Sequence, residues 1–415
     1  MRYVMTKDEV KKDCLIRATV NKQASVSDVA RRLGLSERQV LRLKAKIKKG
    51  ESLLHKNCGN QSRNLDDLLK QKIVDLYKSF EFSGANFLFF KQLLFEHHQI
   101  KISYNALKTL LNKADIRSPR KRKKKEKHSR RPPRECFGDM LQGDATPHQF
   151  FLPFGDVNHY SLHGFIDDAT GTITSLYMTK NECADGYFEV LRDTLVNFGS
   201  PASIYIDGLS LFFSSKKDKL SKQDILNGVE EHKTQVGKIL DDLGIELIRA
   251  LSPQAKGKIE RLWETLQSRL FIEFKIHKID TVEKANKFLK TYIKRYNDQF
   301  AHPAFSEKSM FMQLPKSVNL DTLLTLRETR KLDAGLAFSL NKTIFSVPKC
   351  QPHATVEILF SSRLGMKVLY KDSLYDVVPL RDENKFAFST QDSIRKKMAA
   401  VVQSYIHRNE KLCIA

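Results

Sequence analysis

Hydrophobic and polar positions in the first 116 residues recur with the period of an α-helix. Over 7–50 the apolar residues lie three and four positions apart, and Gly34 interrupts the period where a tight turn is needed. Ser36 followed by Gln39 is a capping box that starts a second, basic helix. This helix-turn-helix pattern predicts a DNA-binding domain over 1–62, with an ordinary helical hairpin as the alternative. The residues expected to meet DNA are Ser36, Arg38, Gln39, Arg42 and Lys44.

A second helical unit is predicted over 63–116. Two stretches with helical periodicity precede a short helix that Ser103 caps. The phenylalanines of this unit are predicted to be core rather than a base-stacking surface; they are Phe87, Phe89, Phe90 and Phe95. A second DNA-binding helix-turn-helix is the functional interpretation. Its expected DNA contacts are Ser103, Tyr104, Asn105 and Lys108.

A basic linker is predicted over 117–136. Its first eighteen residues hold one acidic residue and no large apolar one, so they cannot bury a core. Such a run is often only a solvated segment or a localisation tag. Because this one joins two candidate DNA-binding units to the next domain, we expect it to follow a phosphate backbone. The residues concerned are Arg120, Lys121, Arg122, Lys123, Lys124 and Lys125.

From 137 to 276 short strand-like stretches alternate with helical ones. Strands are expected at 140–144, 160–167, 171–179, 201–207 and 245–250, and helices at 183–199, 228–244 and 258–274. The pattern predicts an α/β domain, a mixed five-stranded sheet with flanking helices. A helical connector over 277–330, a small β-barrel over 331–382 and a polar tail over 383–415 complete a multidomain chain.

Composition adds a polyanionic partner to this picture. The 415 residues include 71 Lys and Arg against 48 Asp and Glu, a formal net charge of +23. Lysine and arginine replace the counterions of phosphates, which favours nucleic acid. A membrane is disfavoured, because no run of about 18 apolar residues occurs and the first residues lack the apolar core of a signal peptide. Six scattered cysteines without a CxxC pair indicate reduced thiols.

Three acidic residues carry the candidate chemistry. Asp144 and Asp207 each end a predicted strand, and Glu260 begins a predicted helix. Carboxylates that converge from such places repel one another unless a cation lies among them, and Mg²⁺ suits oxygen ligands best. Two ions about 3.5–4 Å apart would activate the attacking oxygen and stabilise the leaving one. Taken singly, Asp207 before a glycine is also a common turn, and Glu260 is also an ordinary first-turn acid.

Other polar residues near these acids are expected to be structural. Asp167 and Asp168 end the second strand, where aspartate commonly caps a turn. His148 and His163 could assist proton transfer, but an isolated histidine is more often part of the core.

The stretch from Gln142 through Leu270 resembles the core of DDE transposases in the retroviral-integrase superfamily, and in particular the ISNCY group of bacterial insertion-sequence transposases. The matching segments are QGDATPHQFF, FIDDATG, CADGYFEVLR, SIYIDGLSLF and LGIELIRALSPQAKGKIERLWETLQ, followed by RYNDQFAHPA. The resemblance implies an RNase H-like fold, with Asp144, Asp207 and Glu260 as the acids that hold Mg²⁺ or Mn²⁺. It also implies strand cleavage by water at the ends of a mobile element, and attack of the freed 3′-OH on target DNA.

Further expectations follow from the same resemblance. Lys256, Lys258 and Arg261 flank Glu260 and are expected to hold DNA phosphates. The partners implied are terminal inverted repeats, target DNA and further copies of the chain, in the nucleoid-associated cytoplasm of a bacterium. One motif departs from the family, since Asp207-Gly208-Leu209-Ser210 stands where relatives resemble DRHS. This departure keeps open an alternative, a catalytically impaired, transposase-derived DNA-binding regulator.

Overall fold

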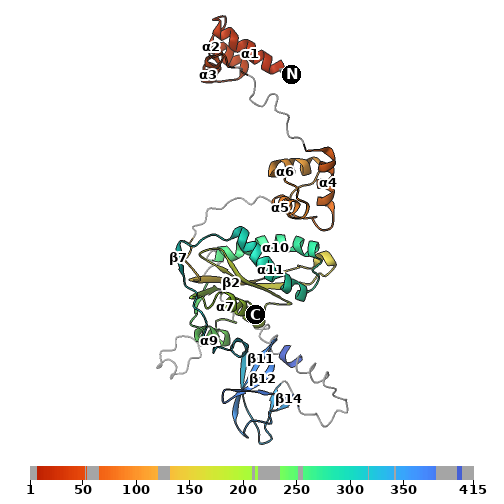
Figure 1. Cartoon of the computed structure of the whole chain (residues 1–415), viewed down its shortest axis with the longest axis vertical. Coiled ribbons are helices and arrows are strands. Elements are labelled where there is room, and N and C mark those ends of the chain that lie inside the picture. The colour runs from red at the N-terminus through yellow and green to blue at the C-terminus, as the bar shows by residue number, and fades with distance from the viewer. Residues whose placement is uncertain are drawn as a thin grey trace. The chain divides into compact units, whose positions relative to one another are not determined.

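The protein divides into two compact units, Met1–Ile73 and Val74–Ala415. Figure 1 shows the helices and strands of the chain. The structure is a computed structural model. It describes residues 7–51, 53, 65–119, 131–207, 211–213, 234–250, 256–315, 317–340, 343–379 and 400–403.

The first unit contains the expected helix, turn and capped helix. Its helices are α1 (Lys7–Val20), α2 (Val26–Leu33) and α3 (Glu37–Lys48). Gly34 ends α2 with a φ of 65°, a left-handed conformation that glycine adopts without strain. Ser36 accepts a hydrogen bond from the Gln39 amide, and the Gln39 side chain accepts one from the Ser36 amide, so the capping box is confirmed. A small core of Ile16, Val29, Ala30 and Val40 holds the three helices together.

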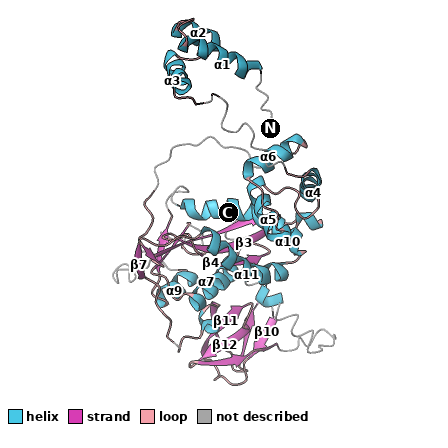
Figure 2. Ribbon diagram, turned by 45° about the horizontal axis from the view of Figure 1, so that its top comes forward, coloured by secondary structure: helices cyan, strands magenta, loops and turns pink. Residues whose placement is uncertain are grey.

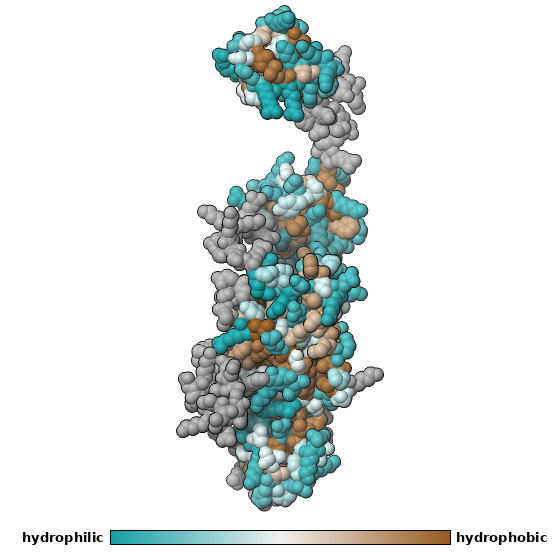
Figure 3. Space-filling model, turned by 90° about the vertical axis from the view of Figure 1, so that its left-hand side faces the viewer, coloured by the Kyte–Doolittle hydropathy of each residue, from teal (hydrophilic) through white to brown (hydrophobic). Residues whose placement is uncertain are grey.

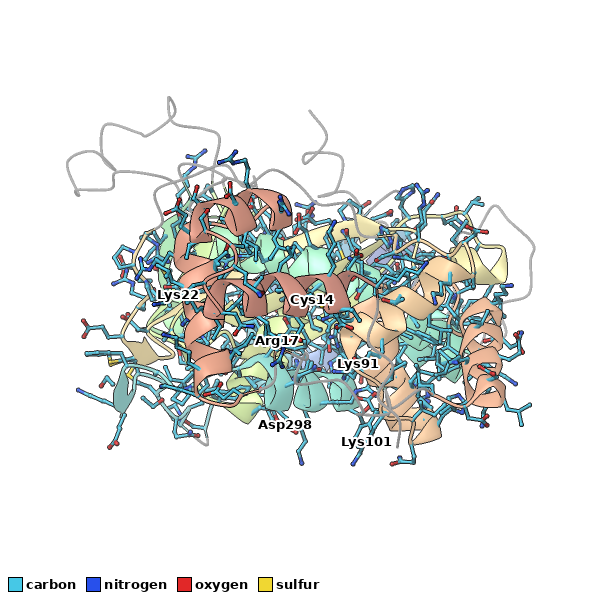
Figure 4. All side chains as sticks on the ribbon, turned by 90° about the horizontal axis from the view of Figure 1, so that it is seen from above. Cys14, Arg17, Lys22, Lys91, Lys101 and Asp298 are labelled. Atoms are coloured by element: carbon cyan, nitrogen blue, oxygen red, sulfur yellow. The ribbon has the colours of Figure 1, made fainter. Side chains whose placement is uncertain are left out.

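Three more helices follow, α4 (Asp67–Lys78), α5 (Phe87–His98) and α6 (Tyr104–Lys113). Phe87, Phe89 and Phe90 are buried, as the sequence predicts. Phe95 is 45% exposed, so its assignment to the core was wrong. It lies on the outer side of α5, where the ammonium of Lys101 lies 5.4 Å from its ring centroid; Figure 4 labels Lys101.

Helix α5 packs on α10 (Gly257–His277) through a buried cation. The guanidinium of Arg269 lies 4.4 Å from the ring centroid of Phe89 and 4.7 Å from that of Phe300. Its Nη2 donates to Gln92 on α5 at 3.1 Å. Lys275 of α10 also donates to the backbone oxygen of Ser83 at 2.5 Å. Sequence periodicity shows the helices but not this docking, which joins residues distant in the chain.

A five-stranded mixed sheet forms the centre of the second unit. Its strands are β2 (Met140–His148), β3 (Tyr160–Asp167), β4 (Ile173–Thr179), β5 (Ser203–Ile206) and β6 (Glu246–Arg249). Their order is β4-β3-β2-β5-β6; β3 is antiparallel to its neighbours β2 and β4, whereas β5 and β6 run parallel to β2. All five predicted strands are present, and the arrangement fits the expected RNase H-like core.

Helices cover both faces of this sheet (Figure 2). One apolar cluster joins Leu141 and Ile204 of the sheet to α7 (Ala184–Asn197) and α9 (Gln235–Asp242). A second cluster joins β3 and β4 to α10 and α11 (Val282–Phe300). Short elements complete the framework: β1 (Cys136–Phe137), the 3₁₀ turn η1 (Leu152–Phe154), β7 (Ser306–Ser309) and α12 (Leu320–Leu323).

The C-terminal strands form two separate sheets, so the predicted small barrel is not confirmed. One sheet has the order β13-β12-β11-β8 and the other β14-β10-β9. Alternating apolar residues predict strands but do not encode ring closure, which depends on pairing between distant edges. The bounds are β8 (Leu326–Lys331), β9 (Ala337–Leu340), β10 (Thr343–Ser346), β11 (Thr355–Ser361), β12 (Gly365–Tyr370), β13 (Ser373–Asp376) and β14 (Val378–Pro379).

The hairpin between β11 and β12 contacts the α/β core. Arg363 makes two bonds to the Glu189 carboxylate of α7, at 2.5 and 2.6 Å. The face drawn in Figure 3 is mixed, with hydrophilic residues beside apolar patches. Within the described ranges, none of the helices has the length and apolar character needed to cross a membrane.

Candidate active site

Asp144 lies within β2, and Asp207 directly follows the neighbouring parallel strand β5 at the same level. Gln142 of β2 pairs with Tyr205 of β5, and each aspartate follows two positions later along its strand direction. Side chains two positions apart on a strand point to the same face. The pairing of β2 with β5 therefore places both aspartate side chains on the same face of the sheet, as the sequence predicts.

A buried ammonium connects the two carboxylates. Nζ of Lys256, which precedes α10, lies 3.0 Å from Oδ1 of Asp144 and 3.5 Å from Oδ2 of Asp207. The Lys256 side chain is only 7% exposed. Oδ1 of Asp207 is buried and has no hydrogen-bond partner. Lysine is rarely buried unless it is paired, and here two acids compensate its charge.

Trp263 binds Asp144 from the helix side. Its indole Nε1 donates to Oδ2 of Asp144 at 3.0 Å. Gly164 on β3 pairs with Asp144, and a Cβ there would lie 2.9 Å from the Trp263 ring. The missing side chain at Gly164 therefore leaves room for the indole to reach the carboxylate.

Hydrogen bonds fix α10 along β2. Oε1 of Gln142 accepts from the Ile259 amide at 3.2 Å, and its Nε2 donates to Asp168 at 2.7 Å. Further along the same strand, Nε2 of Gln267 donates to the hydroxyl of Thr146 at 2.8 Å. These contacts set both the height and the rotation of the helix relative to the acids.

Glu260 is exposed, whereas the side chains of Asp144 and Asp207 are 21% and 44% exposed. It lies four residues after Lys256 and three before Trp263, and such spacings put side chains on one side of a helix. Both neighbours bond to Asp144, so Glu260 belongs to the helix side that faces the site. The structure does not gather all three acids: the described residues include no group of three His, Cys, Asp or Glu side chains that could hold a metal.

The three basic residues around Glu260 differ in their surroundings. Lys256 is engaged by the acids, as described above. The ammonium of Lys258 donates to the backbone oxygen of Asp168, and burial lowers the pKa of this lysine. Arg261 is exposed, with Nε donating to the Gly257 carbonyl at 2.6 Å. Of the three, Arg261 alone combines exposure with a place beside Glu260.

Asp167, Asp168 and His163 are structural, as expected. Asp167 accepts from the amides of Gly138 and Thr170, and so caps the turn after β3. Asp168, with a 2% exposed side chain, binds Arg131 at 2.7 Å and thereby ties down the end of the basic linker. His163 is fully buried, and burial lowers its pKa to about 4.

Of the predicted DNA contacts, Lys256 is buried and Lys258 is half-buried, whereas Arg261 and the described contacts of the helical units are exposed, apart from half-buried Lys44. Ser36 and Ser103 cap α3 and α6, and the remaining contacts of the helical units lie on those two helices. Arg120 to Lys125 fall outside the described residues, as do Gly208, Leu209 and Ser210 of the departing motif.

Sequence reasoning missed the ion-pair role of Lys256 and the contributions of Gln142 and Trp263. One signal could have found the helix residues: positions 256, 260, 263 and 267 form a single stripe at helical spacing. That stripe is polar or aromatic throughout, and it runs beside the buried apolar positions Ile259, Leu262 and Leu266.

Relatives of known type match most of the chain. A transposase for insertion sequence IS1202 of Streptococcus pneumoniae is 32% identical over 363 residues, which cover 79% of this chain and 76% of that protein. The y4bF protein of Sinorhizobium fredii is 32% identical over 349 residues, which cover 81% of this chain and 72% of that protein. No protein-family model matches.

A solved structure also overlaps the chain, though weakly. The simian T-cell lymphotropic virus intasome in complex with PP2A regulatory subunit B56 gamma covers 74% of this chain and 96% of its own, at 15% identity and a TM-score of 0.30. An overlap with so low a TM-score carries no weight for fold or function.

The chain thus combines an α/β core built on a mixed sheet with two aspartates on adjoining segments. At the identity and coverage of its relatives, the chain belongs to the insertion-sequence transposases.

Proposed function

We propose that this DNA transposase is of the DDE type, with Asp144, Asp207 and Glu260 as its metal-binding acids. The observation that carries the proposal is the level placement of Asp144 and Asp207 around one shared cation. Glu260 supports it from the helix side, between two residues that bond to Asp144.

The site suits a divalent cation. A positive charge already lies between the two aspartates, and a buried oxygen of Asp207 has no partner. Carboxylate oxygens are the ligands that Mg²⁺ prefers, and Mn²⁺ accepts the same set. A pair of such ions would supply activation of the attacking oxygen and stabilisation of the leaving oxygen. Lys256, freed from the acids, would then be available to a DNA phosphate, the role that the sequence predicts for it.

The reaction proposed is metal-dependent phosphoryl transfer in two steps. Water first attacks the phosphorus at the element end, the bond to the 3′ oxygen breaks, and that oxygen takes up a proton. The freed 3′-OH then attacks a phosphorus of target DNA and displaces its 3′ oxygen. Asp144, Asp207 and Glu260 would hold the cations, which would supply charge stabilisation at the reacting phosphate, and no covalent bond to the protein would form.

DNA contacts are proposed for two helices and the linker. In α3 they are Ser36, Arg38, Gln39, Arg42 and Lys44; in α6 they are Ser103, Tyr104, Asn105 and Lys108. Exposure of most of these residues supports the proposal. Because transposition joins two element ends to one target, we expect a homodimer or larger assembly on DNA. Neutralising Arg120 to Lys127 should flatten the salt dependence of binding, and an unchanged slope would count against a role for the linker.

A strand-transfer assay with oligonucleotides from the element ends tests the site. Asp144→Asn, Asp207→Asn and Glu260→Gln should each reduce joining in Mg²⁺ by at least about 100-fold. End binding in a mobility-shift assay should stay within a few-fold. Glu307→Gln, an exposed acid on β7, is the matched control. If all three variants still joined ends, the assignment would be wrong; if the wild-type protein bound ends without joining them, the regulator alternative would be favoured.

A further inference from the structure

A buried junction joins α5 to the C-terminal half of α10, and the chemistry above gives it no role. It contains two cationic residues, Arg269, which is 9% exposed, and Lys275, which is 4% exposed. Among the described residues, these cations contact aromatic rings and uncharged oxygens rather than carboxylates. The two apolar clusters of the α/β core contain no residue of α5. The junction is therefore a polar attachment rather than an extension of that core.

Arg269 attaches α5 to α10 and to the end of α11 at the same time. Its guanidinium lies over the rings of Phe89 and Phe300, 4.4 and 4.7 Å from their centroids. Nη2 donates to Oε1 of Gln92 at 3.1 Å, and Nη1 donates to Oε1 of Gln299 at 3.4 Å. The two glutamine amides also bond to each other, at 3.0 and 3.1 Å. Because hydrogen bonds are directional, these contacts fix the rotation of α5 as well as its distance.

Two further contacts hold the same helical unit at other places. Nζ of Lys275 donates to the backbone oxygen of Ser83 at 2.5 Å and to its hydroxyl at 3.0 Å. The ring of Phe80 meets that of Phe154 in η1 edge-on, with 6.1 Å between centroids. Two points of attachment would leave a rotation about the line that joins them, whereas three separate points leave none. The helical unit is thus held on the core in one orientation.

Helix α6, which carries proposed DNA contacts, is fixed to α5. The two helices pack together, and Leu107 and Leu111 of α6 are fully buried. Leu93 and Leu94 of α5 are fully buried as well. Side chains packed in this way cannot shift without losing contacts. The junction that holds α5 therefore also determines where α6 lies relative to α10.

Helix α10 connects the junction to the proposed site. Its first half is fixed along β2 by the hydrogen bonds of Gln142 and Gln267. Glu260 and Arg269 lie on this one helix, about 14 Å apart along its axis at the α-helical rise. Only packed helices lie between α6 and Glu260 along this route, so their separation is constant.

We propose that Arg269 and Lys275 are positioning residues that hold α6 at a set distance from Glu260. The protein would then cleave duplex DNA at a fixed spacing from the segment that α6 binds. The inference rests on the proposed function, because it needs α6 to bind the element end and the acids to act at the cleaved phosphate. Base pairs follow each other at about 3.4 Å along the duplex, so a small displacement of α6 presents a different phosphate to the acids.

Duplex oligonucleotides with the sequence of the element end test this spacing on the full-length protein. Comparison of hydroxyl-radical footprints between the wild-type protein and Lys108→Gln identifies the segment that α6 covers. Substrates then carry one or two extra base pairs between this segment and the cleaved phosphate. In Mg²⁺ the wild-type protein should move its cut by the inserted length, and thereby keep its distance from the α6 segment.

The double variant Arg269→Gln, Lys275→Gln removes both cations of the junction. Cleavage should spread over several neighbouring phosphates, and the share at the wild-type position should fall about 10-fold or more. End binding should stay within about three-fold, because these buried cations make no phosphate contact. Gln92→Leu weakens the junction from the exposed side of α5 and should spread the cuts less. The matched control Lys284→Gln, Lys287→Gln removes two exposed charges and should keep one cut position.

Hydrogen exchange measures the release of α5 without DNA. In the double variant the amides of α5 should exchange faster, while those of β2 and β3 should keep their wild-type rates. If β2 and β3 also exchange faster, the core itself is disturbed, and Gln92→Leu then decides the question.

The outcomes separate this inference from the proposed function. A single, unmoved cut position in the double variant or, where the core is disturbed, in Gln92→Leu refutes the role of the junction and leaves the DDE assignment in place. A wild-type cut that stays at the element terminus whatever the insert refutes it as well, as does a footprint that Lys108→Gln leaves unchanged. Absence of cleavage by the wild-type protein would overturn the proposed function, and this inference with it.

Discussion

The strand side and the helix side of the candidate site position their acids in different ways. Asp144 and Asp207 are level because two parallel strands pair in one register, and both contact the same ammonium. Glu260 is exposed, and only the phase and attachment of α10 determine where it lies. The comparison teaches that the first two acids are fixed by the backbone, whereas the third depends on its neighbours along the helix.

The largest loss of stability is expected when the hydrogen bonds of Gln142, which connect β2 to α10, are removed. Gln142→Leu removes the acceptor for the Ile259 amide and a donor to buried Asp168. Leaving such groups unpaired should lower the free energy of unfolding by about 2–5 kcal/mol. Strand transfer should fall by more than this loss explains, because Glu260 loses its placement. Urea unfolding followed by Trp263 fluorescence measures the effect, with Gln149→Leu as the control for a less buried glutamine.

A pH titration tests how firmly the strand side is buried. Burial lowers the pKa of His163 to about 4, below the ordinary value of 6.5. Between these values the unfolded chain binds a proton that the folded chain does not. The free energy of unfolding should therefore fall by up to about 3 kcal/mol as the pH drops from about 6.5 to 4. His163→Gln should remove this part of the slope, and the exposed His159→Gln should keep it.

A smaller loss is expected at Asp144 itself. Asp144→Asn keeps the side-chain shape but removes one of the two charges that compensate buried Lys256. We expect the free energy of unfolding to fall by about 2 kcal/mol in metal-free buffer, measured by urea unfolding. A gain in stability would show that the ammonium is not held by this pair.

The smallest effect on stability belongs to the helix side. Glu260→Gln replaces an exposed side chain and should leave the free energy of unfolding within about 0.5 kcal/mol of wild type. Its effect on strand transfer should nevertheless equal that of Asp144→Asn. A large change in stability would mean that Glu260 is bonded within the fold, and the contrast between the two sides would fail.

Much of this arrangement could be predicted from local sequence. The strand end before Asp207, the helix start near Glu260 and the order of elements follow from short-range periodicity, but the end predicted at Asp144 was wrong, because β2 continues to His148 in its pairing with β3. The role of Lys256 could not be predicted, because a lysine beside a glycine suggests a surface phosphate contact. Its burial depends on two carboxylates distant in the chain. The bond from Trp263 to Asp144 likewise depends on the open space at Gly164, which only the strand pairing reveals.

The core position of Phe95 and the C-terminal barrel, which the structure does not confirm, were predicted for the same physical reason. Phe95 has the period of a core residue, but α5 is covered by Arg269 and its partners on the other side. The C-terminal strands alternate correctly, yet their pairing leaves two sheets with open edges. In both cases the pattern correctly predicts the helix or strand. It does not predict which distant part of the chain that helix or strand packs against or pairs with.

The ammonium of Lys256 has a consequence for the order of events in the life of the protein. A chain that carries its own counter-ion for two crowded carboxylates can complete its fold during synthesis without capturing a metal ion. Binding of the divalent cations that we propose would then be a separate, later event, in which Lys256 must be displaced from the carboxylates. Commitment to DNA breakage would thereby be separated in time from folding.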